Sequence, residues 1–417
     1  METSNFNIIK IVKDKYYIFN TFSKAVIKVD ELIGASIESG NIATLAPDII
    51  ESLFKNGILV DSRIHEKQAI HDQYLKIRNS TDSVFITLLP TMKCNFRCPY
   101  CFEGIDAKTE IQDIDFDILK KAATIYFPRR KHVHITLFGG EPLIMWDKLR
   151  ELFLFISELS NKHGFSYTSS IATNAFFLNK TVIEDLISIC HTESFQITID
   201  GCQSTHNQTR KLINGNSTYN VVLENLKELI KQNPKGKLNV LLRVNLLNNS
   251  ENDVLELLNE FSEDERRHFE IYFRPIYNTK EFCSDNNNKT NLEPFYQLAR
   301  KQGFRTHYGN YVRFWHCEGD GGVEQIHIMP DLSIWKCANN MDADEANIGK
   351  IINTGEMILD MDKVNAWKNN DPFNDLRCGT CVLLPICWGG CPLNYLKKKQ
   401  RTCIYEKGFD FIDTFIR

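Results

Sequence analysis

The chain has 417 residues, which is long enough for two or three domains, one of which can bury a large core. Hydrophobic residues make up 43% and charged residues 24%, as in an ordinary soluble protein, and the formal net charge is -4. Because a basic excess is absent, we expect no nucleic-acid partner and no membrane partner. The first residues, METSNFNIIK, lack a signal-peptide pattern, and no apolar run reaches the roughly 20 residues of a spanning helix, so we expect a cytoplasmic protein.

Residues 1–80 differ in pattern from the rest of the chain. Residues 15–29 predict a β-hairpin that turns around 20–24, and a short helical stretch and the apolar run 57–60 follow it. Two interpretations stay open. The segment either decorates the domain that follows, or it is a small peptide-holding domain whose exposed edge strand accepts a substrate segment by β-augmentation.

The middle of the chain repeats a short β-rich apolar run followed by an amphipathic helical stretch, as parallel βα units do. Six strands are expected, at residues 84–89, 132–138, 167–172, 195–199, 238–246 and 269–276. Helices are expected between them at residues 113–126, 146–161, 181–188, 218–232 and 251–261. The pattern predicts a barrel-like or doubly wound α/β domain over 81–280, in which right-handed crossovers gather the residues after each strand at one face.

Thirteen cysteines are many for a reducing compartment, where metal binding or catalysis is the usual reason for them. Three lie within eight residues, and seven lie between Cys317 and Cys403. A polar, turn-rich stretch precedes the second group, so we expect a linker over 281–310 and a cysteine-rich domain over 311–417. Cys190 and Cys202 fall outside both groups, and we expect them to be buried or incidental thiols.

The first cysteine group, Cys94, Cys98 and Cys101, follows the first strand of the βα region with CxxxCxxC spacing. Three thiolates do not complete a four-ligand zinc site. On a [4Fe-4S] cluster they leave one iron open to a small chelating molecule that takes an electron. A zinc site that borrows a histidine is the alternative.

With an aromatic residue before its last cysteine, this motif resembles the signature of the radical S-adenosylmethionine (SAM) enzymes. The stretch FGGEP, residues 138–142, follows the second strand and resembles the GGEP motif of that family. Taken alone, it is also compatible with a plain Gly-Gly turn before a helix that starts with proline. The resemblance covers about residues 84–276 and implies a partial (β/α)6 TIM-like barrel. It implies SAM contacts from Tyr100, Phe102, Gly139, Gly140, Glu141, Pro142, Thr173, Asn174, Thr198, Arg210 and Arg243.

Roles within this set also follow from the resemblance. The two glycines let the backbone approach SAM, and the Glu141 carboxylate accepts hydrogen bonds from its ammonium group. Arg243 is expected to reach the SAM carboxylate. For Arg210 and Arg243, a structural ion pair is the open alternative.

The second cysteine group contains the run CGTCVLLPICWGGC. Two zinc sites would need eight ligands where seven thiols are present. The array resembles the SPASM domain, the C-terminal extension of radical SAM enzymes that modify peptides and proteins, which holds two auxiliary [4Fe-4S] clusters. The resemblance implies one cluster on Cys378, Cys381, Cys387 and Cys403, and another on Cys317, Cys337 and Cys391. The three-thiol set leaves an iron able to take a substrate thiolate, unless Cys283 or another side chain reaches it.

Two positions depart from the SPASM pattern. Leu332 stands where the family has a glycine, from which we expect a slightly different turn. Ala338 follows Cys337, where sulfatase maturases that resemble this chain carry an aspartate as proton acceptor. This disfavours a sulfatase-maturase-like enzyme that forms formylglycine.

The N-terminal extension and the SPASM cysteines together resemble maturases of ribosomally made peptides, in which the first domain recognises a leader peptide. The resemblance implies three [4Fe-4S] clusters, SAM, a precursor peptide substrate, and a low-potential electron donor such as flavodoxin or ferredoxin. The expected product is a thioether, a sulfur-to-carbon crosslink. The alternatives are carbon-carbon crosslinking, epimerisation or formylglycine formation and, outside enzymes, an iron-sulfur electron carrier or an inactive peptide-binding relative. No catalytic residue is identified.

Overall fold

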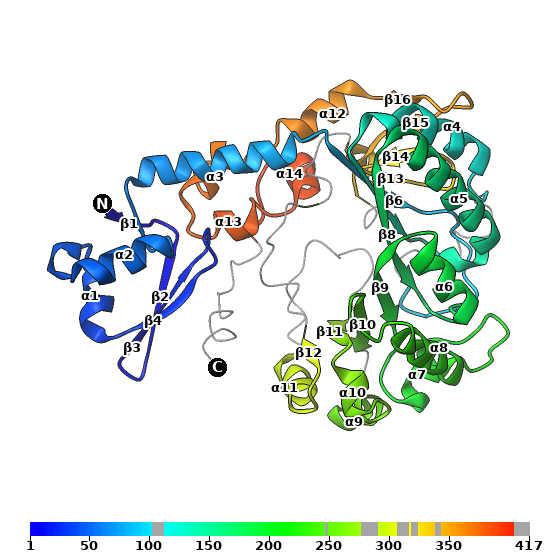
Figure 1. The fold of residues 1–417 in the computed structure, drawn as a ribbon, viewed down its shortest axis with the longest axis horizontal. Coiled ribbons are helices and arrows are strands. Elements are labelled where there is room, and N and C mark those ends of the chain that lie inside the picture. The colour runs from blue at the N-terminus through cyan, green and yellow to red at the C-terminus, as the bar shows by residue number, and fades with distance from the viewer. Residues whose placement is uncertain are drawn as a thin grey trace. The chain divides into compact units, whose positions relative to one another are not determined.

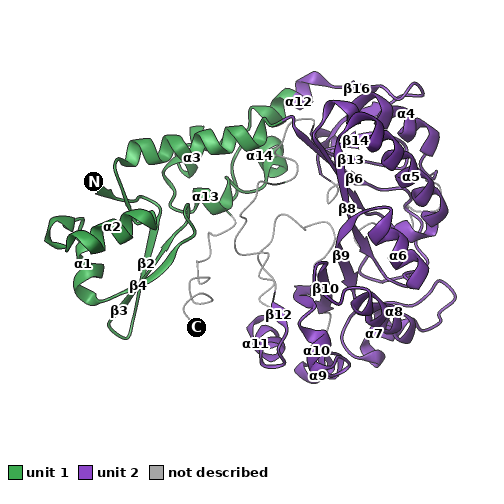
Figure 2. Ribbon diagram, in the orientation of Figure 1, with its two compact units in different colours: residues 1–80, 309–322, 365–417 green, residues 81–308, 323–364 purple. Residues whose placement is uncertain are grey.

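The computed structural model describes residues 1–101, 112–246, 249–276, 291–306, 317, 324–337 and 343–403. The chain divides into two compact units (Figure 2). The first combines residues 1–80, 309–322 and 365–417, and the second combines 81–308 and 323–364. In the part of the chain that the structure describes, no helix is long and apolar enough to cross a membrane.

The second unit is built on one eleven-stranded sheet, in the order β12-β11-β10-β9-β8-β7-β6-β13-β14-β15-β16 (Figure 1). The middle of the sheet consists of six parallel strands: β6 (Ser83–Leu88), β7 (His132–Leu137), β8 (Ser166–Thr173), β9 (Thr192–Thr198), β10 (Asn239–Leu246) and β11 (Phe269–Pro275). These are the six strands expected from the sequence, in the expected order. The α/β partial barrel is confirmed.

Helices connect these strands: α4 (Phe116–Tyr126), α5 (Trp146–His163), α6 (Lys180–Ser188), α7 (Gln203–Thr209), α8 (Tyr219–Lys231), α9 (Glu251–Asn259) and α10 (Glu263–Arg266). Local caps set several of their starts. Asp115 accepts hydrogen bonds from the first turn of α4, and Ser250 and Asp253 form a capping box at α9. The polar helix α7 lacks an apolar period and was not expected.

The strands present one apolar and one polar face. On β7, Val133, Ile135 and Leu137 are buried, whereas the alternate residues His132, His134 and Thr136 are half-buried. The polar residues are hydrogen-bonded across to β8, for example His134 Nδ1 to Thr168 Oγ1 at 2.8 Å. Ser170 of β8 lies on this face, because it is hydrogen-bonded to Thr136. Ala172 follows it by two residues in the same strand and therefore lies on the same face. The candidate site lies at the carboxyl end of this face.

The sheet extends beyond the barrel strands at both edges. Next to β6 lie β13 (Gln325–Ile328), which is parallel to it, and then β14 (Ser333–Trp335), β15 (Asn347–Ile351) and β16 (Met357–Leu359). At the other edge lies β12 (Arg305–Thr306). The range 281–310, where we expected a linker, contains the helix α11 (Glu293–Lys301). The 3-10 turns in the described part of this unit are η3 (Phe127–Arg129), η4 (Pro142–Met145) and η7 (Asp344–Ala346).

Leu332 lies in the turn between β13 and β14 with a φ of 64°. This is the left-handed conformation that glycine adopts at little cost and other residues at about 1–2 kcal/mol. The expected difference from the turn of the SPASM family stays a prediction. The chain keeps the backbone conformation that suits a glycine although a leucine occupies the position.

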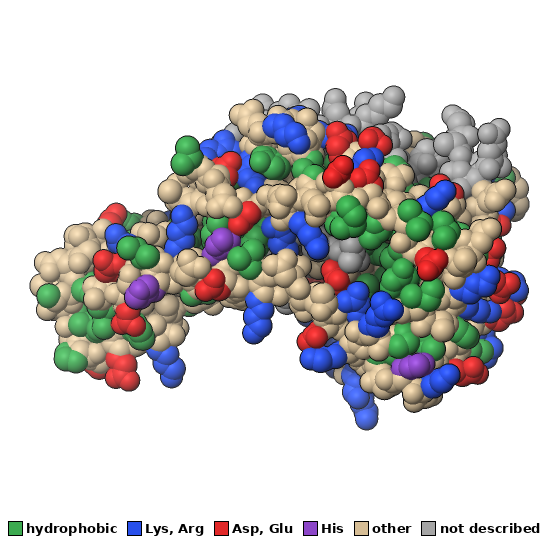
Figure 3. All heavy atoms as spheres, turned by 90° about the horizontal axis from the view of Figure 1, so that it is seen from above, with side chains coloured by type: hydrophobic (Ala, Val, Ile, Leu, Met, Phe, Trp, Pro, Cys, Tyr) green, Lys and Arg blue, Asp and Glu red, His purple; other side chains and the backbone are tan. Residues whose placement is uncertain are grey.

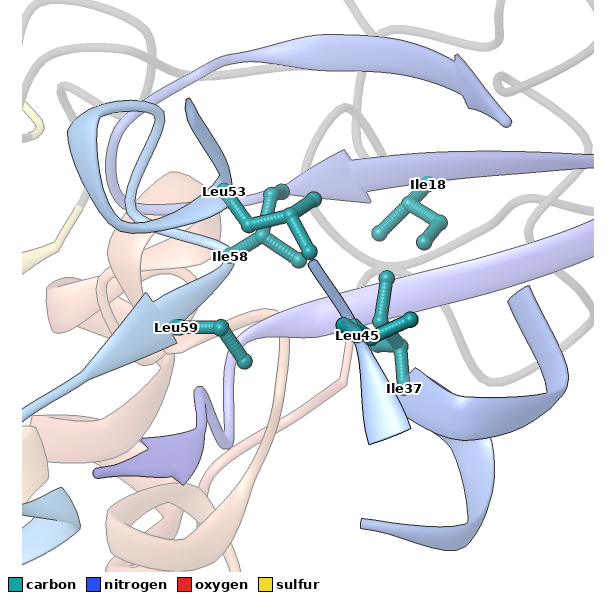
Figure 4. Packing of buried hydrophobic residues seen from close by; sticks show 6 residues of the cluster. All are labelled: Ile18, Ile37, Leu45, Leu53, Ile58 and Leu59. Carbon is teal, nitrogen blue, oxygen red and sulfur yellow. The ribbon is translucent and has the colours of Figure 1, made fainter. Parts of the chain in front are cut away.

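The first unit begins with a small antiparallel sheet in the order β2-β3-β4. The expected hairpin is confirmed, because β3 (Lys15–Asn20) pairs with β4 (Val26–Val29), and β2 (Asn7–Val12) adds a third strand. The elements α1 (Glu31–Ser39), η1 (Ile42–Thr44), α2 (Pro47–Lys55) and β5 (Leu59–Val60), which pairs with β1 (Glu2–Thr3), complete this part. Figure 4 shows its core, formed by Ile18, Ile37, Leu45, Leu53, Ile58 and Leu59.

The long helix α3 (Arg63–Arg78) joins this N-terminal part to the cysteine-rich C-terminal part of the same unit. The Tyr74 ring stacks on Trp388 with centroids 5.6 Å apart, and Arg78 Nη2 donates to the Trp367 carbonyl at 2.6 Å. One hydrophobic cluster contains Phe6, Ile70, Tyr74, Phe373 and Leu384. The two ends of the chain therefore share a core. The C-terminal elements begin with α12 (Met361–Lys368), whose first four residues are counted with the second unit. They continue with η8 (Pro372–Asn374), η9 (Cys378–Thr380), α13 (Leu384–Cys387) and α14 (Pro392–Lys398).

Acidic and basic side chains lie side by side on the face that Figure 3 shows. Exposed ion pairs of the structure include Lys131 with Asp82 at 2.8 Å. Exposed pairs of this kind contribute little to stability, since water and salt screen them. The buried apolar clusters are therefore the main source of stability in both units.

Candidate active site

A pocket opens at the carboxyl ends of the parallel strands of the second unit. It holds about 990 Å³ of space, counted out to its open mouth. The expected SAM contacts that line it are Tyr100, Gly139, Gly140, Thr173, Asn174, Thr198, Arg210 and Arg243. Glu141 and Pro142 are buried but not in the lining, and Phe102 lies outside the described residues. Residues from five strand ends and from the loop after β6 thus meet in one place.

The three cysteines of the first group line this same pocket. The Cys94 sulfur accepts hydrogen bonds from the Phe96 backbone N–H at 3.4 Å and from Asn174 Nδ2 at 3.8 Å. Such donors favour a thiolate and tune a cluster bound through it. The lining thus offers thiol donors and polar groups together, as expected for a [4Fe-4S] cluster that shares its site with a small polar ligand.

In the described residues, no three His, Cys, Asp or Glu side chains converge around the position of a single metal ion. A [4Fe-4S] cubane makes a different demand, because each of its thiolates binds a separate iron. The donor set that lines the pocket, three thiols on one short loop, fits the cubane.

The GGEP turn packs directly against the stretch that leads into the cysteine loop. Gly140 N donates to the Thr91 carbonyl at 3.1 Å, and Glu141 N donates to the Lys93 carbonyl at 2.9 Å. A Cβ on Gly140 would lie only 2.2 Å from that Lys93 carbonyl oxygen. Gly139 has a φ of 105°, which side chains rarely tolerate. Both glycines are therefore required by close backbone packing, in addition to any contact with a ligand.

The Glu141 carboxylate is fully buried and ties the end of β7 to the end of β8. It accepts hydrogen bonds from Thr173 Oγ1 at 2.8 Å, from Asn174 N at 2.7 Å and from Leu143 N at 3.1 Å. Burial raises its pKa to about 7, although these hydrogen bonds oppose the rise. Both carboxylate oxygens therefore already accept hydrogen bonds from the protein. The expected contact of Glu141 with the SAM ammonium group stays a prediction.

Tyr100 is the centre of a buried polar network. Its hydroxyl donates to Asp200 and accepts from Arg210 Nη1 at 3.1 Å and Asn245 Nδ2 at 3.4 Å. Asp200 also accepts from Thr209 Oγ1 at 3.1 Å. Burial raises the pKa of Tyr100, so the phenol stays neutral. The aromatic residue of the cysteine motif thus connects the loop to β9, α7 and β10.

Arg210 lies within the same network. Burial acts to lower its pKa, but Tyr100, Cys98 and Asp200 outweigh burial and raise it, so the guanidinium is charged. It lies over the Phe96 ring at 5.4 Å, and its Nε has no hydrogen-bond partner in the described structure. A buried guanidinium N–H of this kind is suited to an anionic ligand.

Sequence analysis missed three polar residues of this region, Asp200, Asn245 and Arg274. Asp200 follows the end of β9, and the other two lie on β10 and β11. Asn245 accepts from Arg243 Nε at 2.9 Å, and Asn245 and Arg274 line the pocket. Their only signal in the sequence is strand alternation, which places Asn245 and Arg243 on one face.

The second candidate site is the set Cys378, Cys381, Cys387 and Cys403 in the first unit. Arg401, which is buried, connects the segments that carry them. Its Nη1 donates to the Gly389 carbonyl at 3.3 Å, its Nη2 donates to Asn370 Oδ1 at 2.7 Å, and its Nε lies 3.7 Å from Asp375. Asp375 in turn accepts from the Cys378 N–H at 2.9 Å.

Glycines allow the segment that ends at Cys403 to pack closely against the turn after Cys387. A Cβ on Gly390 would lie 2.6 Å from the carbonyl oxygen of Thr402, the neighbour of Cys403. Trp388, Gly389 and Gly390 all have positive φ, so the chain wraps tightly between Cys387 and Cys391. The segment that ends at Cys403 therefore packs against the turn after Cys387.

The set Cys317, Cys337 and Cys391 stays a prediction. Cys337 belongs to the second unit and the other two belong to the first. Cys283 and Ala338 lie outside the described residues. Cys190 and Cys202 are buried, as expected.

Comparison with known families agrees with this geometry. A sequence model of the Radical SAM superfamily matches residues 88–261, which contain the cysteine loop and the GGEP turn. The chain is a radical SAM enzyme. Its fold, a partial barrel with a small N-terminal β domain and a C-terminal cysteine-rich region, relates it to the SPASM-domain maturases.

Curated relatives resemble most of this radical SAM enzyme. The radical SAM cyclopropyl synthase TigE of Paramaledivibacter caminithermalis is 21% identical over 404 residues, which cover 87% of this chain and 79% of that protein. The cysteine-type anaerobic sulfatase-maturating enzyme of Clostridium novyi is 24% identical over 332 residues, covering 72% and 85%.

A solved structure extends the likeness to the whole chain. SuiB of Streptococcus suis, bound to its precursor peptide SuiA, has a TM-score of 0.53 at 15% identity and covers 97% of this chain and 100% of its own. At this identity the likeness shows the fold alone. It includes the N-terminal sheet as well as the barrel.

Proposed function

We propose that this enzyme modifies a ribosomally made precursor peptide by forming a thioether between a cysteine sulfur and a carbon of another residue. The observation that carries the proposal is the single pocket in which Cys94, Cys98 and Cys101 meet the polar strand ends. When bound there, the cluster and SAM supply a 5'-deoxyadenosyl radical that removes a hydrogen atom from the substrate.

The chain's own residues bind SAM and orient it in the pocket. Thr173, Asn174 and Thr198 offer hydrogen-bonding groups, and Arg243 offers a charge for the SAM carboxylate. Phe96, which is buried, and the half-buried Phe138 give the same pocket apolar walls. Such walls keep water from a reactive intermediate.

A peptide substrate is supported by the relatives. SuiB was solved with a precursor peptide, and the Clostridium novyi relative is named as a sulfatase-maturating enzyme. In this chain, the N-terminal sheet has β2 and β4 at its edges, and Ile11 and Val26 on them are exposed. An added peptide strand would pair with one of these edges, with the leader part of the precursor as the expected segment.

The thioether is supported by the cysteine count. Seven C-terminal cysteines supply four ligands to one auxiliary cluster and three to the other, which is one thiol short. A cysteine of the substrate is the complementary group. Ala338, in place of an acidic residue, argues against formylglycine formation.

A second candidate is carbon-carbon bond formation in a peptide. The likeness to the cyclopropyl synthase TigE over 87% of this chain favours it. Both candidates remove two hydrogen atoms from the peptide, so the mass of the product alone does not separate them. Thiol reactivity does, since only the thioether consumes a cysteine.

The experiment is co-expression of the full chain with a short cysteine-rich peptide encoded beside its gene, followed by mass spectrometry before and after iodoacetamide. A thioether predicts loss of two hydrogens and one fewer alkylated cysteine than in peptide expressed with the Cys94→Ala, Cys98→Ala, Cys101→Ala variant. Loss of two hydrogens with all thiols still alkylated indicates the carbon-carbon candidate. An aldehyde that reacts with a hydrazide indicates formylglycine, and either outcome contradicts the thioether.

A further inference from the structure

Arg210 contacts the cysteine loop at two of its aromatic residues. Its guanidinium lies over the ring of Phe96 at 5.4 Å, and its Nη1 donates to the Tyr100 hydroxyl at 3.1 Å. Phe96 stands between the first and second cysteines of the loop, and Tyr100 stands between the second and third. Arg210 is 7% exposed and lines the same pocket as the three thiols. A buried guanidinium therefore lies beside the donors of the expected cluster.

Asp200 brings the opposite charge to the same hydroxyl. The Tyr100 hydroxyl donates to the Asp200 carboxylate and accepts from Arg210, so it bridges the two. The carboxylate also accepts from Thr209 Oγ1 at 3.1 Å and from the Asn245 backbone N–H at 3.2 Å. One phenol thus connects a buried carboxylate to a buried guanidinium.

A neutral histidine links the backbone of these two residues. His206 Nδ1 accepts from the Asp200 N–H at 3.2 Å, so Nε2 carries the proton and donates to Thr218 Oγ1 at 3.0 Å. The Thr218 hydroxyl then donates to the Arg210 carbonyl at 2.6 Å. Burial lowers the pKa of His206, and the charge of Arg210 adds to this effect, so the imidazole stays neutral. The two charged residues are therefore held together by the backbone as well as by the phenol.

The cysteine loop is among the groups that interact with the charge of Arg210. Burial acts to lower the pKa of this guanidinium, but Tyr100, Cys98 and Asp200 outweigh burial and raise it. Glu141 also interacts with this charge, although its hydrogen bonds go to Thr173 Oγ1 and to backbone N–H groups. Charges act on one another more strongly in a buried place than in water, because the effective dielectric is lower.

Reduction by one electron makes a cluster more negative. A nearby positive charge therefore favours the reduced form, and a nearby negative charge favours the oxidised form. The net charge around an iron-sulfur cluster is one of the factors that set its reduction potential. Arg210 and Asp200 are both buried next to the loop, so both are suited to act in this way.

We infer that Arg210 and Asp200 together set the reduction potential of the [4Fe-4S] cluster on the cysteine loop. Arg210 makes that cluster easier to reduce, and Asp200 limits the effect. Both are positioning residues, since they act on the cluster through charge and make no bond to a substrate. A higher potential lowers the demand on the electron donor. The inference goes beyond the proposed function and does not depend on the peptide or on the bond that is formed in it.

The test is an anaerobic potentiometric titration of the full, reconstituted chain, followed by electron paramagnetic resonance in the absence of SAM. The variant that lacks the thiols of Cys94, Cys98 and Cys101 is titrated in parallel, and subtraction of its spectra leaves the signal of this one cluster. At a fixed potential, we expect Arg210→Gln to lower the ratio of reduced to oxidised cluster about tenfold, which is a shift of about 59 mV for one electron. Asp200→Asn should shift the potential in the opposite direction. Arg210→Lys keeps the charge and should stay closer to the wild type than Arg210→Gln does.

Arg150 and Asp185 are the matched control pair. Arg150 Nε donates to Asp185 Oδ2 at 2.8 Å, between α5 and α6, and neither residue lines the pocket. Arg150→Gln and Asp185→Asn remove the same charges away from the cysteine loop. Both should leave the potential unchanged.

The opposite signs separate an effect of charge from a structural one, because a disturbed loop would change both variants alike. Four results overturn the inference: an unchanged or raised potential in Arg210→Gln, an unchanged or lowered potential in Asp200→Asn, equal shifts in the control pair, or loss of this cluster's iron from both variants. If only Arg210→Gln loses its iron, the shift in Asp200→Asn decides. Failure of the proposed function is distinguishable, because it appears in the peptide product, whereas the titration needs no substrate.

Discussion

The hydroxyl of Tyr100 donates a hydrogen bond to the carboxylate of Asp200. This contact joins the cysteine loop after β6 to the end of β9, which lies three strands away in the sheet. Arg210, the residue after α7, and Asn245 of β10 donate to the same hydroxyl. The residue before the third cysteine is therefore part of the structure that holds the loop in place.

Tyr100→Phe tests this network. The substitution removes the hydroxyl and leaves Asp200, which is 1% exposed, with one donor fewer. We expect the free energy of unfolding to fall by about 1–3 kcal/mol, the usual cost of an unsatisfied buried polar group. We also expect weaker SAM binding, measured by equilibrium dialysis, because the loop loses its connection to Arg210 and Asn245.

Tyr167→Phe is the control for that variant. Its hydroxyl donates to the Ile189 carbonyl at 2.8 Å, away from the pocket. It should lose stability but keep SAM affinity. Equal SAM affinity in the two variants would contradict the role given to Tyr100.

Gly140→Ala tests the packing of the GGEP turn. The new methyl group would meet the Lys93 carbonyl oxygen at 2.2 Å and the Met92 carbonyl oxygen at 2.5 Å, both of which are backbone. We expect displacement of the cysteine loop, with loss of iron from the SAM-binding cluster. Gly164→Ala is the control, because Gly164 has a φ of 78° but nothing within 4 Å of its Cβ position. It should lose stability through backbone strain and retain its iron.

Glu141→Gln tests the buried carboxylate through the pH dependence of stability. The pKa of Glu141 rises from 4.5 to about 7 on folding, so between these values the folded protein holds a proton that the unfolded chain has released. The stability from this proton is complete below about pH 4.5 and is lost as the pH rises through about 7. The rise corresponds to about 3 kcal/mol, at about 1.4 kcal/mol per pH unit.

The variant cannot titrate at this position. Relative to Glu141→Gln, the wild type should therefore lose up to about 3 kcal/mol of unfolding free energy between pH 4.5 and 7. Urea denaturation of both proteins at a series of pH values measures this difference. Parallel stability curves would show that Glu141 keeps its ordinary pKa in the fold.

Arg401→Gln tests the four-cysteine set of the first unit. It removes the contacts with Asn370, Gly389 and Asp375, and we expect a loss of about 3 kcal/mol, as for other broken buried pairs. Iron should fall from about twelve to about eight per chain, since one of three cubanes is lost. Lys397→Gln, on the exposed side of α14, is the control and should retain all of its iron. An unchanged iron content in Arg401→Gln would show that Arg401 is not needed to hold the cluster.

The strands and helices that the sequence predicted are those whose signal is local. The run from Val133 to Leu137 alternates apolar and polar residues, and α8 has an apolar helical period, so both could be recognised without knowledge of their partners. The same holds for the hairpin of β3 and β4. The cysteine motifs could be recognised because their spacing is itself the signal.

Features that depend on distant partners could not be predicted. The strand β13 has four residues, too few for a clear alternation, and it joins the sheet by pairing with β6, far away in the chain. The contact of Tyr74 with Trp388, which unites the two ends of the chain in one core, has no local pattern. The position of Asn245 beside Arg274 follows only from the parallel register of β10 and β11.

The most direct test of the central claim is release of 5'-deoxyadenosine by the anaerobically reconstituted chain after reduction with dithionite in the presence of SAM. The account predicts release by the wild type, with about twelve irons per chain. It predicts no release and about eight irons for the variant that lacks the thiols of Cys94, Cys98 and Cys101. A reduced wild type with its full iron content and no 5'-deoxyadenosine, or equal release by the variant, would contradict the claim that this pocket performs radical SAM chemistry.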